Sequence, residues 1–285
     1  MRFPAVHRSI LITGASSGIG LAAATIMAGR GWQVFATVRK EEDRERLAAL
    51  PGVTPLLMDY ADPASIAATA EAVLEATGGR LGALYNNGAY GQPGALEDIS
   101  TEVLRQVFEV NVLGWHDLTR RFVPAMRQAG AGRIVMCSSI LGFLSMPYRG
   151  AYNASKHAVE GLADSWRLEL IDAGIHVATL QPGPIATNFV ATSMKQFRDN
   201  VDVEGSANAA GYRQRLDDMR RPPEASVFRK PPEAVVDCLV HACESARPRP
   251  YYRITWLTKG AAVVKHLLPA SLFVALLHRA AKAGN

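Results

Sequence analysis

The chain alternates short apolar runs with longer helical patterns, and this alternation restricts its fold more than any other feature. The runs typical of strands are residues 9–13, 33–38, 53–58, 81–86, 133–138 and 176–181. Helical patterns lie between them, near 18–30, 41–50, 63–77, 100–129 and 150–173. Strands that are apolar almost throughout belong to sheets covered on both faces, and their crossovers are right-handed. The sequence therefore predicts an α/β fold, a doubly wound parallel sheet with helices on both faces.

The length and the apolar pattern favour a single domain. The 285 residues can bury one large core, and no linker-like stretch precedes residue 190. The longest apolar runs fall short of the ~20 residues that cross a bilayer. Three cysteines, an odd number without zinc-ligand spacing, fit a reducing cytoplasm and predict no metal site.

The net charge of +5 is concentrated in the last third of the chain. Residues 195–285 hold 15 Lys and Arg against 9 Asp and Glu, which leaves residues 1–194 at −1. No nucleic-acid recognition module is visible, so we expect no nucleic-acid partner. The basic excess is interpreted either as a solvated face or as a surface for anionic membranes.

A glycine-rich turn, TGASSGIG, follows the first predicted strand and opens a helix. Gly14, Gly18 and Gly20 have the spacing G-x-x-x-G-x-G, which differs from the usual G-x-G-x-x-G dinucleotide pattern. No lysine follows them, which excludes a G-x-x-x-x-G-K-[ST] phosphate loop. Free amide groups at a helix N-terminus favour a pyrophosphate, and glycine lets the backbone approach it closely. The position of the turn in the fold favours a dinucleotide.

The end of the second predicted strand indicates which dinucleotide. An acidic residue usually stands there to bind a free ribose 2′-hydroxyl, but this chain has Val38 and then Arg39. An arginine can bind a 2′-phosphate through charge-assisted hydrogen bonds, and Ser16 and Ser17 offer further donors. We therefore expect NADP rather than NAD.

With these residues in place, the sequence resembles the classical short-chain dehydrogenase/reductase family, whose fold is the Rossmann fold. The motifs that carry the resemblance run in the family's order over residues 9 to about 190: TGASSGIG at 13–20, MDYAD at 58–62, NNGA at 86–89, Asn111 in FEVNVLG, CSS at 137–139, YNASK at 152–156 and QPGPIATNF at 181–189. The family's usual NNAG reads NNGA here. The branch that it resembles most contains hydroxysteroid- and retinol-type dehydrogenases.

The resemblance implies a catalytic set and a cofactor site. By position, the catalytic residues are Asn111, Ser139, Tyr152 and Lys156. The implied cofactor contacts are Gly14, Ser16, Ser17, Gly18, Ile19, Gly20, Arg39, Asp59, Tyr60, Asn87, Gly88, Tyr152, Lys156, Pro182, Gly183, Ile185 and Thr187. In this scheme Ser139 hydrogen-bonds the substrate oxygen, and Asn111 binds a water that relays protons to Lys156.

Elementary electrostatics explains why a phenol and an ammonium stand four residues apart. Residues at this spacing share a helix face, so Lys156 can act on the Tyr152 hydroxyl. Shifting the phenol pKa from ~10 to neutrality requires about 4 kcal/mol. An ammonium at ~4 Å in an effective dielectric of ~20 supplies about 4 kcal/mol before the cost of desolvation. We therefore expect Lys156 to lower the pKa of Tyr152.

The remaining third is expected to form a substrate lid and a tail. We assign residues 1–257 to the cofactor-binding domain, with a lid near 188–230, and 258–285 to a helical extension. Pro269 should split the extension, after which an apolar face forms that packs on protein or rests on lipid. Four lid residues are expected to give a lipophilic inner face: Phe189, Met194, Phe197 and Tyr212. The apolar face of the tail is expected to contain Leu272, Phe273, Leu276, Leu277 and Ala280.

The sequence thus predicts an NADP-dependent oxidoreductase that interconverts an alcohol and a carbonyl on a lipophilic substrate. Its expected location is cytoplasmic, with peripheral membrane contact possible through the C-terminal helix, and its expected state is a homodimer or homotetramer. One alternative is a non-catalytic NADP-binding sensor, which would not need the full set Asn-Ser-Tyr-Lys. Another is a sugar-nucleotide epimerase or dehydratase, which normally has a G-x-x-G-x-x-G turn and a longer substrate domain.

Overall fold

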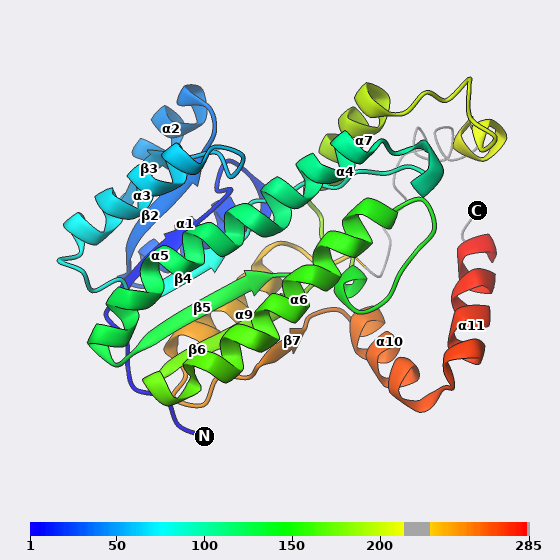
Figure 1. Cartoon of the computed structure of the whole chain (residues 1–285). Helices are drawn as coiled ribbons and strands as arrows, with labels where there is room; N and C mark the ends of the chain where they lie inside the picture. Colours follow the sequence, from blue (N-terminus) through cyan, green and yellow to red (C-terminus); the bar gives the residue numbers. More distant parts are fainter. Residues whose placement is uncertain (214–228, 284–285) are drawn as a thin grey trace.

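The computed structural model describes residues 1–213 and 229–283, and its centre is one parallel sheet of seven strands (Figure 1). The strand order is β3-β2-β1-β4-β5-β6-β7, and every pair is parallel. The strands are β1 Ser9–Ile12, β2 Gln33–Val38, β3 Val53–Leu57, β4 Ala83–Asn86, β5 Gly132–Cys137, β6 Ile175–Gln181 and β7 Tyr251–Arg253. The predicted doubly wound parallel sheet is confirmed.

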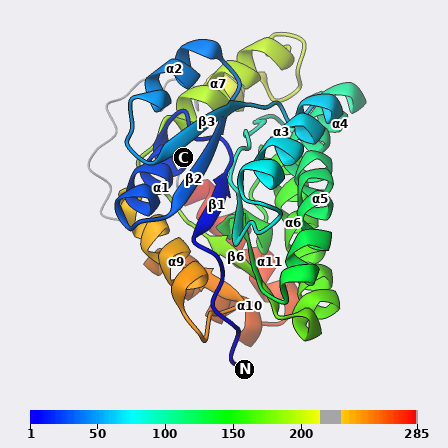
Figure 2. The ribbon, with the colours of Figure 1, turned by 90° about the vertical axis from the view of Figure 1, so that its left-hand side faces the viewer.

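Helices cover both faces of the sheet, as the apolar strands require. In Figure 2, α1 and α9 lie on one side, and α3, α5 and α6 lie on the other. The longer helices of the sheet region are α1 Gly18–Gly29, α2 Glu41–Ala48, α3 Pro63–Ala76, α4 Thr101–Phe108, α5 Gly114–Ala129, α6 Gly150–Leu170 and α9 Glu233–Glu244. The central strands β1, β4, β5 and β6 are buried along their whole length.

The direction of strand addition reverses between β1 and β4, which are neighbours in the sheet. Strands β2 and β3 extend the sheet on one side of β1, and β4 to β7 extend it on the other. Loops that leave β1 and β4 therefore turn toward opposite faces, and the crevice between them is where such folds bind ligands. This point fixes where the site must be sought.

The predicted helix 100–129 is interrupted. Residues Glu109–Leu113 form a π-helical turn between α4 and α5, and this turn contains Asn111. The sequence pattern could not show the interruption, because a π turn adds a single residue without changing the apolar character. Such turns often mark functional positions, since they redirect the side chains that they carry.

Three further helices form the C-terminal third: α7 Phe189–Asn200, α10 Trp256–Leu267 and α11 Ala270–Ala283. Pro269 separates α10 from α11, so the predicted break is confirmed. The predicted face of α11 is wrong in part. Phe273 and Leu277 pack inward, whereas Leu272 and Leu276 are exposed. Part of the predicted lid, residues 214–228, lies outside the described residues. None of the helices in the described ranges is long and apolar enough to cross a bilayer.

Helix α5 approaches the loop after β3 closely, and Gly114 permits this approach. A Cβ atom at Gly114 would lie 2.7 Å from the Cβ and carbonyl oxygen of Tyr60. On α6, by contrast, nothing lies within 4 Å of a Cβ at the exposed Gly161. The two helical glycines therefore differ in the space around them.

We expect Gly114→Ala to lower the free energy of unfolding by about 1–3 kcal/mol, because the added methyl overpacks the contact with Tyr60. Gly161→Ala, the matched control, should raise it by up to about 1 kcal/mol through helix propensity alone. Urea denaturation followed by circular dichroism measures both. Equal effects of the two substitutions would contradict the close approach described here.

Candidate active site

The predicted chemistry-bearing residues collect at the carboxyl ends of the central strands. Gly14 follows β1, Asn87 follows β4, Ser139 follows β5 and Pro182 follows β6. Parallel strands end at the same edge of a sheet, so these four turns lie side by side over the crevice at the β1/β4 reversal. The first turn of α6 adds Tyr152 to the same edge.

Tyr152 is almost buried, with 9% of its surface exposed. Its ring packs with Leu141 and Leu144, and its centroid lies 5.4 Å from that of Phe189. The hydroxyl of Ser139 hydrogen-bonds the phenol and works to lower its pKa. Ser139 also accepts a hydrogen bond from the amide of Leu141 at 3.1 Å. The predicted serine and tyrosine are therefore together, in apolar surroundings.

Lys156 lies beneath Tyr152, one turn further along α6, and is 1% exposed. Its Nζ donates a hydrogen bond to the carbonyl oxygen of Cys137 at 2.8 Å. The ammonium lies 4.3 Å from the ring centroid of Trp115 and 5.6 Å from that of Tyr152. A buried charge requires such partners, since its loss of hydration is costly.

Burial, and not the lysine, dominates the acidity of the tyrosine in this structure. Burial raises the pKa of Tyr152 well above its ordinary value, and the hydrogen bond from Ser139 only partly opposes this. The expectation that Lys156 lowers the Tyr152 pKa is therefore wrong for the chain by itself. The attraction of ~4 kcal/mol between the two side chains did not include the free-energy cost of desolvation. Burial of the phenol adds that cost, which opposes ionisation of Tyr152. Tyr152 is accordingly protonated at neutral pH.

Burial acts on Lys156 in the opposite sense and lowers its pKa to about 8. The nearby carboxyl of Glu160 raises that pKa and so favours the charged form. At neutral pH the ammonium therefore persists, close to the pH at which it would lose its proton.

Asn111 occupies the π turn and is fully buried. Its Nδ2 donates to the carbonyl oxygen of Tyr90 at 2.9 Å and to Ser155 Oγ at 3.2 Å, and its Oδ1 accepts from the amide of Tyr90 at 3.1 Å. The side chain thus joins the π turn to the segment after β4 and to α6. Its predicted contact with a proton-relaying water stays a prediction.

Two residues at the site, the buried Trp115 and the partly buried Glu160, escaped the sequence reasoning. Trp115 faces the ammonium of Lys156 and donates a hydrogen bond from Nε1 to the carbonyl oxygen of Gly88 at 2.8 Å. Glu160, one turn beyond Lys156, accepts hydrogen bonds from Thr179 at 3.0 Å and from Gln181 at 2.9 Å. Burial raises the pKa of Glu160. The sequence signal that could have identified Glu160 was its position four residues after Lys156.

The glycine turn packs as a close crossing of two backbones. Gly14 and Gly18 have positive φ angles of 65° and 56°. A Cβ at Gly14 would lie 2.5 Å from the Cα of Gly88, and one at Gly20 would lie 2.2 Å from the Gly14 carbonyl oxygen. Ser17 caps α1 without a side-chain capping hydrogen bond. The first amides of α1 lack partners inside the helix, so this turn fits a pyrophosphate.

The residues around this turn hold it in place. Asn87 Nδ2 donates to the carbonyl oxygens of Thr13 at 3.0 Å and Gly14 at 3.3 Å. The Tyr60 hydroxyl is buried and bonds Thr13 and Asn86, and burial raises its pKa. The phenol of Tyr60, one of the predicted cofactor contacts, is therefore directed into the core.

Arg39 is exposed directly after β2, where a 2′-phosphate would lie. Its charge lowers the pKa of Tyr90, which burial raises more strongly, so the two side chains are electrostatic neighbours. The other predicted contact at this end, Asp59, accepts a hydrogen bond from the amide of Ala61 at 2.9 Å. A cation without a carboxylate at this position suits a phosphorylated ribose.

The loop after β6 reaches the glycine turn. Gly183 packs against Thr255, and a Cβ at Gly18 would lie 3.0 Å from Thr187 Cγ2. Pro182 accepts a hydrogen bond from the amide of Ile140 at 2.8 Å, and Ile185 forms an isolated bridge with Lys230. The predicted residues Pro182, Gly183, Ile185 and Thr187 therefore bring this loop beside α1 and the turn that follows Ser139.

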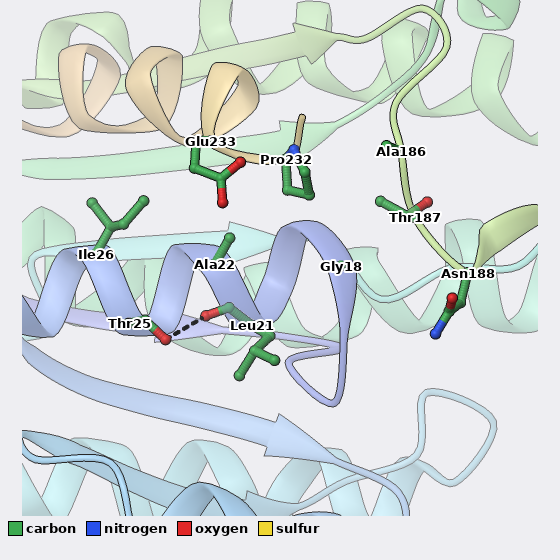
Figure 3. A pocket seen from close by; sticks show the side chains of 10 residues that line it. All are labelled: Gly18, Leu21, Ala22, Thr25, Ile26, Ala186, Thr187, Asn188, Pro232 and Glu233. Carbon is green, nitrogen blue, oxygen red and sulfur yellow. Dashed lines mark hydrogen bonds between the residues drawn. The ribbon is translucent and has the colours of Figure 1, made fainter. Parts of the chain in front are cut away.

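A pocket of about 450 Å³ lies along the outer side of α1. Figure 3 shows Leu21, Thr25 and Ile26 of α1 on one side, with Glu233 and Thr187 opposite. Among the predicted site residues, it is lined only by Gly18 and Thr187. The pocket therefore holds none of the catalytic set.

The apolar lid residues divide into two groups. Phe189 contacts Tyr152, as a wall of a substrate cavity would. Phe197 and Tyr212 instead pack together in a separate buried cluster, with Met194 against it. Within the described ranges, no group of three or more His, Cys, Asp and Glu residues could hold a metal ion.

The comparisons with known proteins agree with this geometry. The model of the short chain dehydrogenase family matches residues 8–197. An uncharacterized oxidoreductase, YbbO, of Escherichia coli K12 is 39% identical over 95% of this chain and 94% of its own length. Human retinol dehydrogenase 8 is 30% identical over 86% of this chain and 80% of its own.

Solved structures share the fold over nearly the whole chain. A short-chain dehydrogenase from Streptomyces avermitilis has a TM-score of 0.76 and 28% identity, covering 99% of this chain and 100% of that one. A homologue from Burkholderia phymatum in complex with NAD has a TM-score of 0.72, 29% identity and coverage of 88% and 89%. One from Sphingobium yanoikuyae in complex with NADPH has a TM-score of 0.69 and 25% identity, covering 90% of this chain and 92% of that one. With the glycine turn and the Ser-Tyr-Lys constellation in place, this chain belongs to the short-chain dehydrogenase/reductase family and is a nicotinamide-dependent oxidoreductase.

Proposed function

We propose that the protein is an NADP(H)-dependent oxidoreductase that interconverts a lipophilic alcohol and its carbonyl. The observation that carries the proposal is the grouping of Ser139, Tyr152 and Lys156 in a buried, apolar setting beside the glycine turn. Relatives include enzymes of steroid and retinol metabolism by name, which supports the substrate class. A bound nicotinamide would give or accept the hydride.

In the proposed mechanism the chain moves the proton. Tyr152 is protonated at neutral pH, so its Oη can give a proton to a carbonyl oxygen during reduction and take it back during oxidation. The Ser139 hydroxyl would turn from the phenol and donate its hydrogen bond to the same substrate oxygen. The ammonium of Lys156 would stabilise the tyrosinate left after proton transfer.

The cofactor would be held by the turns around the crevice. The amides of the glycine turn would bind the pyrophosphate, and Arg39 would bind a 2′-phosphate. Solved relatives occur with NAD and with NADPH, so the preference for NADP depends on this chain's own Arg39 and on the missing acid beside it.

The apolar surroundings of Tyr152 support a lipophilic substrate. Tyr152 is packed among apolar residues from four separate segments of the chain: the turn after Ser139, α7, α10 and α11. Phe189 of α7 and Phe273 of α11 belong to this group. A substrate that reaches Tyr152 must therefore pass apolar side chains, which favours hydrocarbon over polar substituents.

We further propose a homodimer or homotetramer in the cytoplasm, in peripheral contact with a membrane through the C-terminal helix. The three cysteines, Cys137, Cys238 and Cys243, are free thiols, which is compatible with a reducing compartment.

Tyr152→Phe should bind NADPH normally and lose at least ~100-fold in turnover, because it removes only the proton donor. Straight-chain aldehydes of increasing length serve as substrates, and kcat/KM of the unaltered protein should rise with chain length. Tyr251→Phe, which changes an exposed phenol on β7, is the control. A Tyr152→Phe protein that retained full turnover would refute the assigned role.

Arg39→Gln should weaken NADPH binding by about 10–100-fold, the effect of losing a charged hydrogen bond, and should leave NADH binding nearly unchanged. Quenching of tryptophan fluorescence measures both affinities. The neighbouring Lys40→Gln is the control, since Lys40 pairs with Glu42 at 3.0 Å. If NADPH and NADH titrate equally in the unaltered protein, Arg39 does not select the cofactor.

Lys156→Met should raise the free energy of unfolding below pH 8 by about 3 kcal/mol. This is the free energy that folding loses by burying a charged lysine whose pKa falls from 10.5 to about 8. Between pH 8 and 10.5 the unfolded lysine binds more protons than the folded one, so the unaltered protein gains stability as the pH rises. The difference between the two proteins should therefore shrink across this window. Urea titrations at several pH values measure it, and a difference independent of pH would contradict the lowered pKa.

A further inference from the structure

The C-terminal helices α10 and α11 carry an unusual number of exposed, large apolar side chains. They lie at one end of the molecule, beyond β7, and extend away from the sheet (Figure 1). The exposed apolar residues of this pair are Trp256, Leu257, Val263, Leu267, Leu272, Val274 and Leu276. Helix geometry places Val274 on another side of α11 from Leu272 and Leu276, so we call the other six residues the outer apolar surface. Soluble surfaces scatter such residues singly, so their concentration on two consecutive helices indicates a partner.

The spacing of these residues places them on continuous helix faces. Trp256, Val263 and Leu267 stand at positions i, i+7 and i+11 of α10, which share one face. On α11, Leu272 and Leu276 are one turn apart and are 56% and 45% exposed. Each helix therefore presents an apolar stripe and not isolated residues.

The face of α11 that adjoins this stripe is already covered by the protein itself. Phe273 and Leu277 pack against the cluster of Leu141, Leu144 and Tyr152. The helix is thus attached to the body through its inner face, directly above the candidate catalytic tyrosine. Its outer stripe serves no contact within the described part of the chain that would explain an apolar composition.

The charge of this region identifies the chemistry of the partner. After Glu244 the chain contains seven Lys and Arg and no Asp or Glu. Arg253, Lys259, Lys265 and Arg279 are exposed, and none of them takes part in an ion pair among residues 1–213 and 229–283. A wholly basic border around an apolar surface is complementary to an anionic, apolar partner.

A second copy of this chain fits the charges less well. A two-fold symmetric interface brings the same patch of each copy together, so the basic border would face another basic border without acidic residues to pair with. An anionic bilayer meets both demands, because its headgroups bind the cations while the acyl boundary accepts the apolar side chains. Trp256 suits this boundary, since indole rings concentrate at membrane interfaces.

We propose that the outer apolar surface of α10 and α11 docks on anionic lipid bilayers, which brings the apolar cluster around Tyr152 close to the lipid surface. The reason the protein would use such docking rests on the proposed lipophilic substrate, because that substrate would be dissolved in the bilayer. The docking itself rests on the exposed residues and their charge, and it is measured without substrate or cofactor.

The experiment is co-sedimentation of the full chain with vesicles of phosphatidylcholine, with and without phosphatidylserine. The intact protein should pellet with the phosphatidylserine vesicles, less so as salt is raised. Leu272→Ser combined with Leu276→Ser should lower the partition coefficient at least about tenfold, because two leucines leave the acyl boundary. Leu113→Ser with Leu168→Ser, which changes exposed leucines of the π turn and of α6, is the matched control and should bind normally.

The cationic border is tested in the same assay. Lys259→Gln with Arg279→Gln should weaken binding to phosphatidylserine vesicles by about fivefold for each charge removed. Arg44→Gln with Arg105→Gln removes two exposed cations elsewhere and should have no such effect. Light scattering reports the oligomer mass of every variant, and circular dichroism reports its fold.

Two results would overturn the proposal. One is an intact protein that stays in the supernatant with phosphatidylserine vesicles at low salt. The other is a leucine variant that pellets like the intact protein. If the oligomer of that variant also dissociates, the surface is a contact between copies of the chain. Because the assay measures no turnover, its results can be interpreted even if the proposed catalytic role is wrong.

Discussion

The site depends on one buried ammonium group. Lys156 keeps its charge in the interior because three elements meet around it. The carbonyl oxygen of Cys137 at the end of β5 accepts a hydrogen bond from it, the ring of Trp115 on α5 faces it, and Tyr152 lies one turn before it on α6. Without these partners the desolvation cost would deprotonate or expel the lysine. The contacts that hold Lys156 at the site are therefore also contacts that pack α5 and α6 on the sheet.

This arrangement also explains the state of the tyrosine. The apolar side chains that exclude water from Tyr152 raise its pKa, so the chain by itself holds a proton donor and not a tyrosinate. The same side chains form a lipophilic approach to the hydroxyl. Two of them, Phe273 and Leu277, come from α11, whose other face is apolar and exposed. The apolar surroundings of Tyr152 and the exposed stripe of Leu272 and Leu276 are thus adjoining faces of a single helix.

Much of the architecture could be predicted because it depends on local pattern. The apolar runs, the glycine turn and Pro269 gave the strands, the entry to α1 and the break between α10 and α11, since each follows from backbone geometry within a few residues. The π turn at Asn111 could not be predicted in this way. Trp115 and Glu160 were missed because the role of such a tryptophan or glutamate depends on the residues that fold against it.

The sequence by itself determined the family, the order of the strands along the chain and the identity of Ser139, Tyr152 and Lys156 as a group, because residue type and spacing carry that information. Only the tertiary structure decided the acidity of those groups and which side of α11 meets the protein. Both depend on burial, which is a sum over contacts between segments distant in sequence. The acidity could not be predicted from the attraction between two neighbours on one helix. The desolvation that opposes this attraction is imposed by β5, α5, α7 and α11 together.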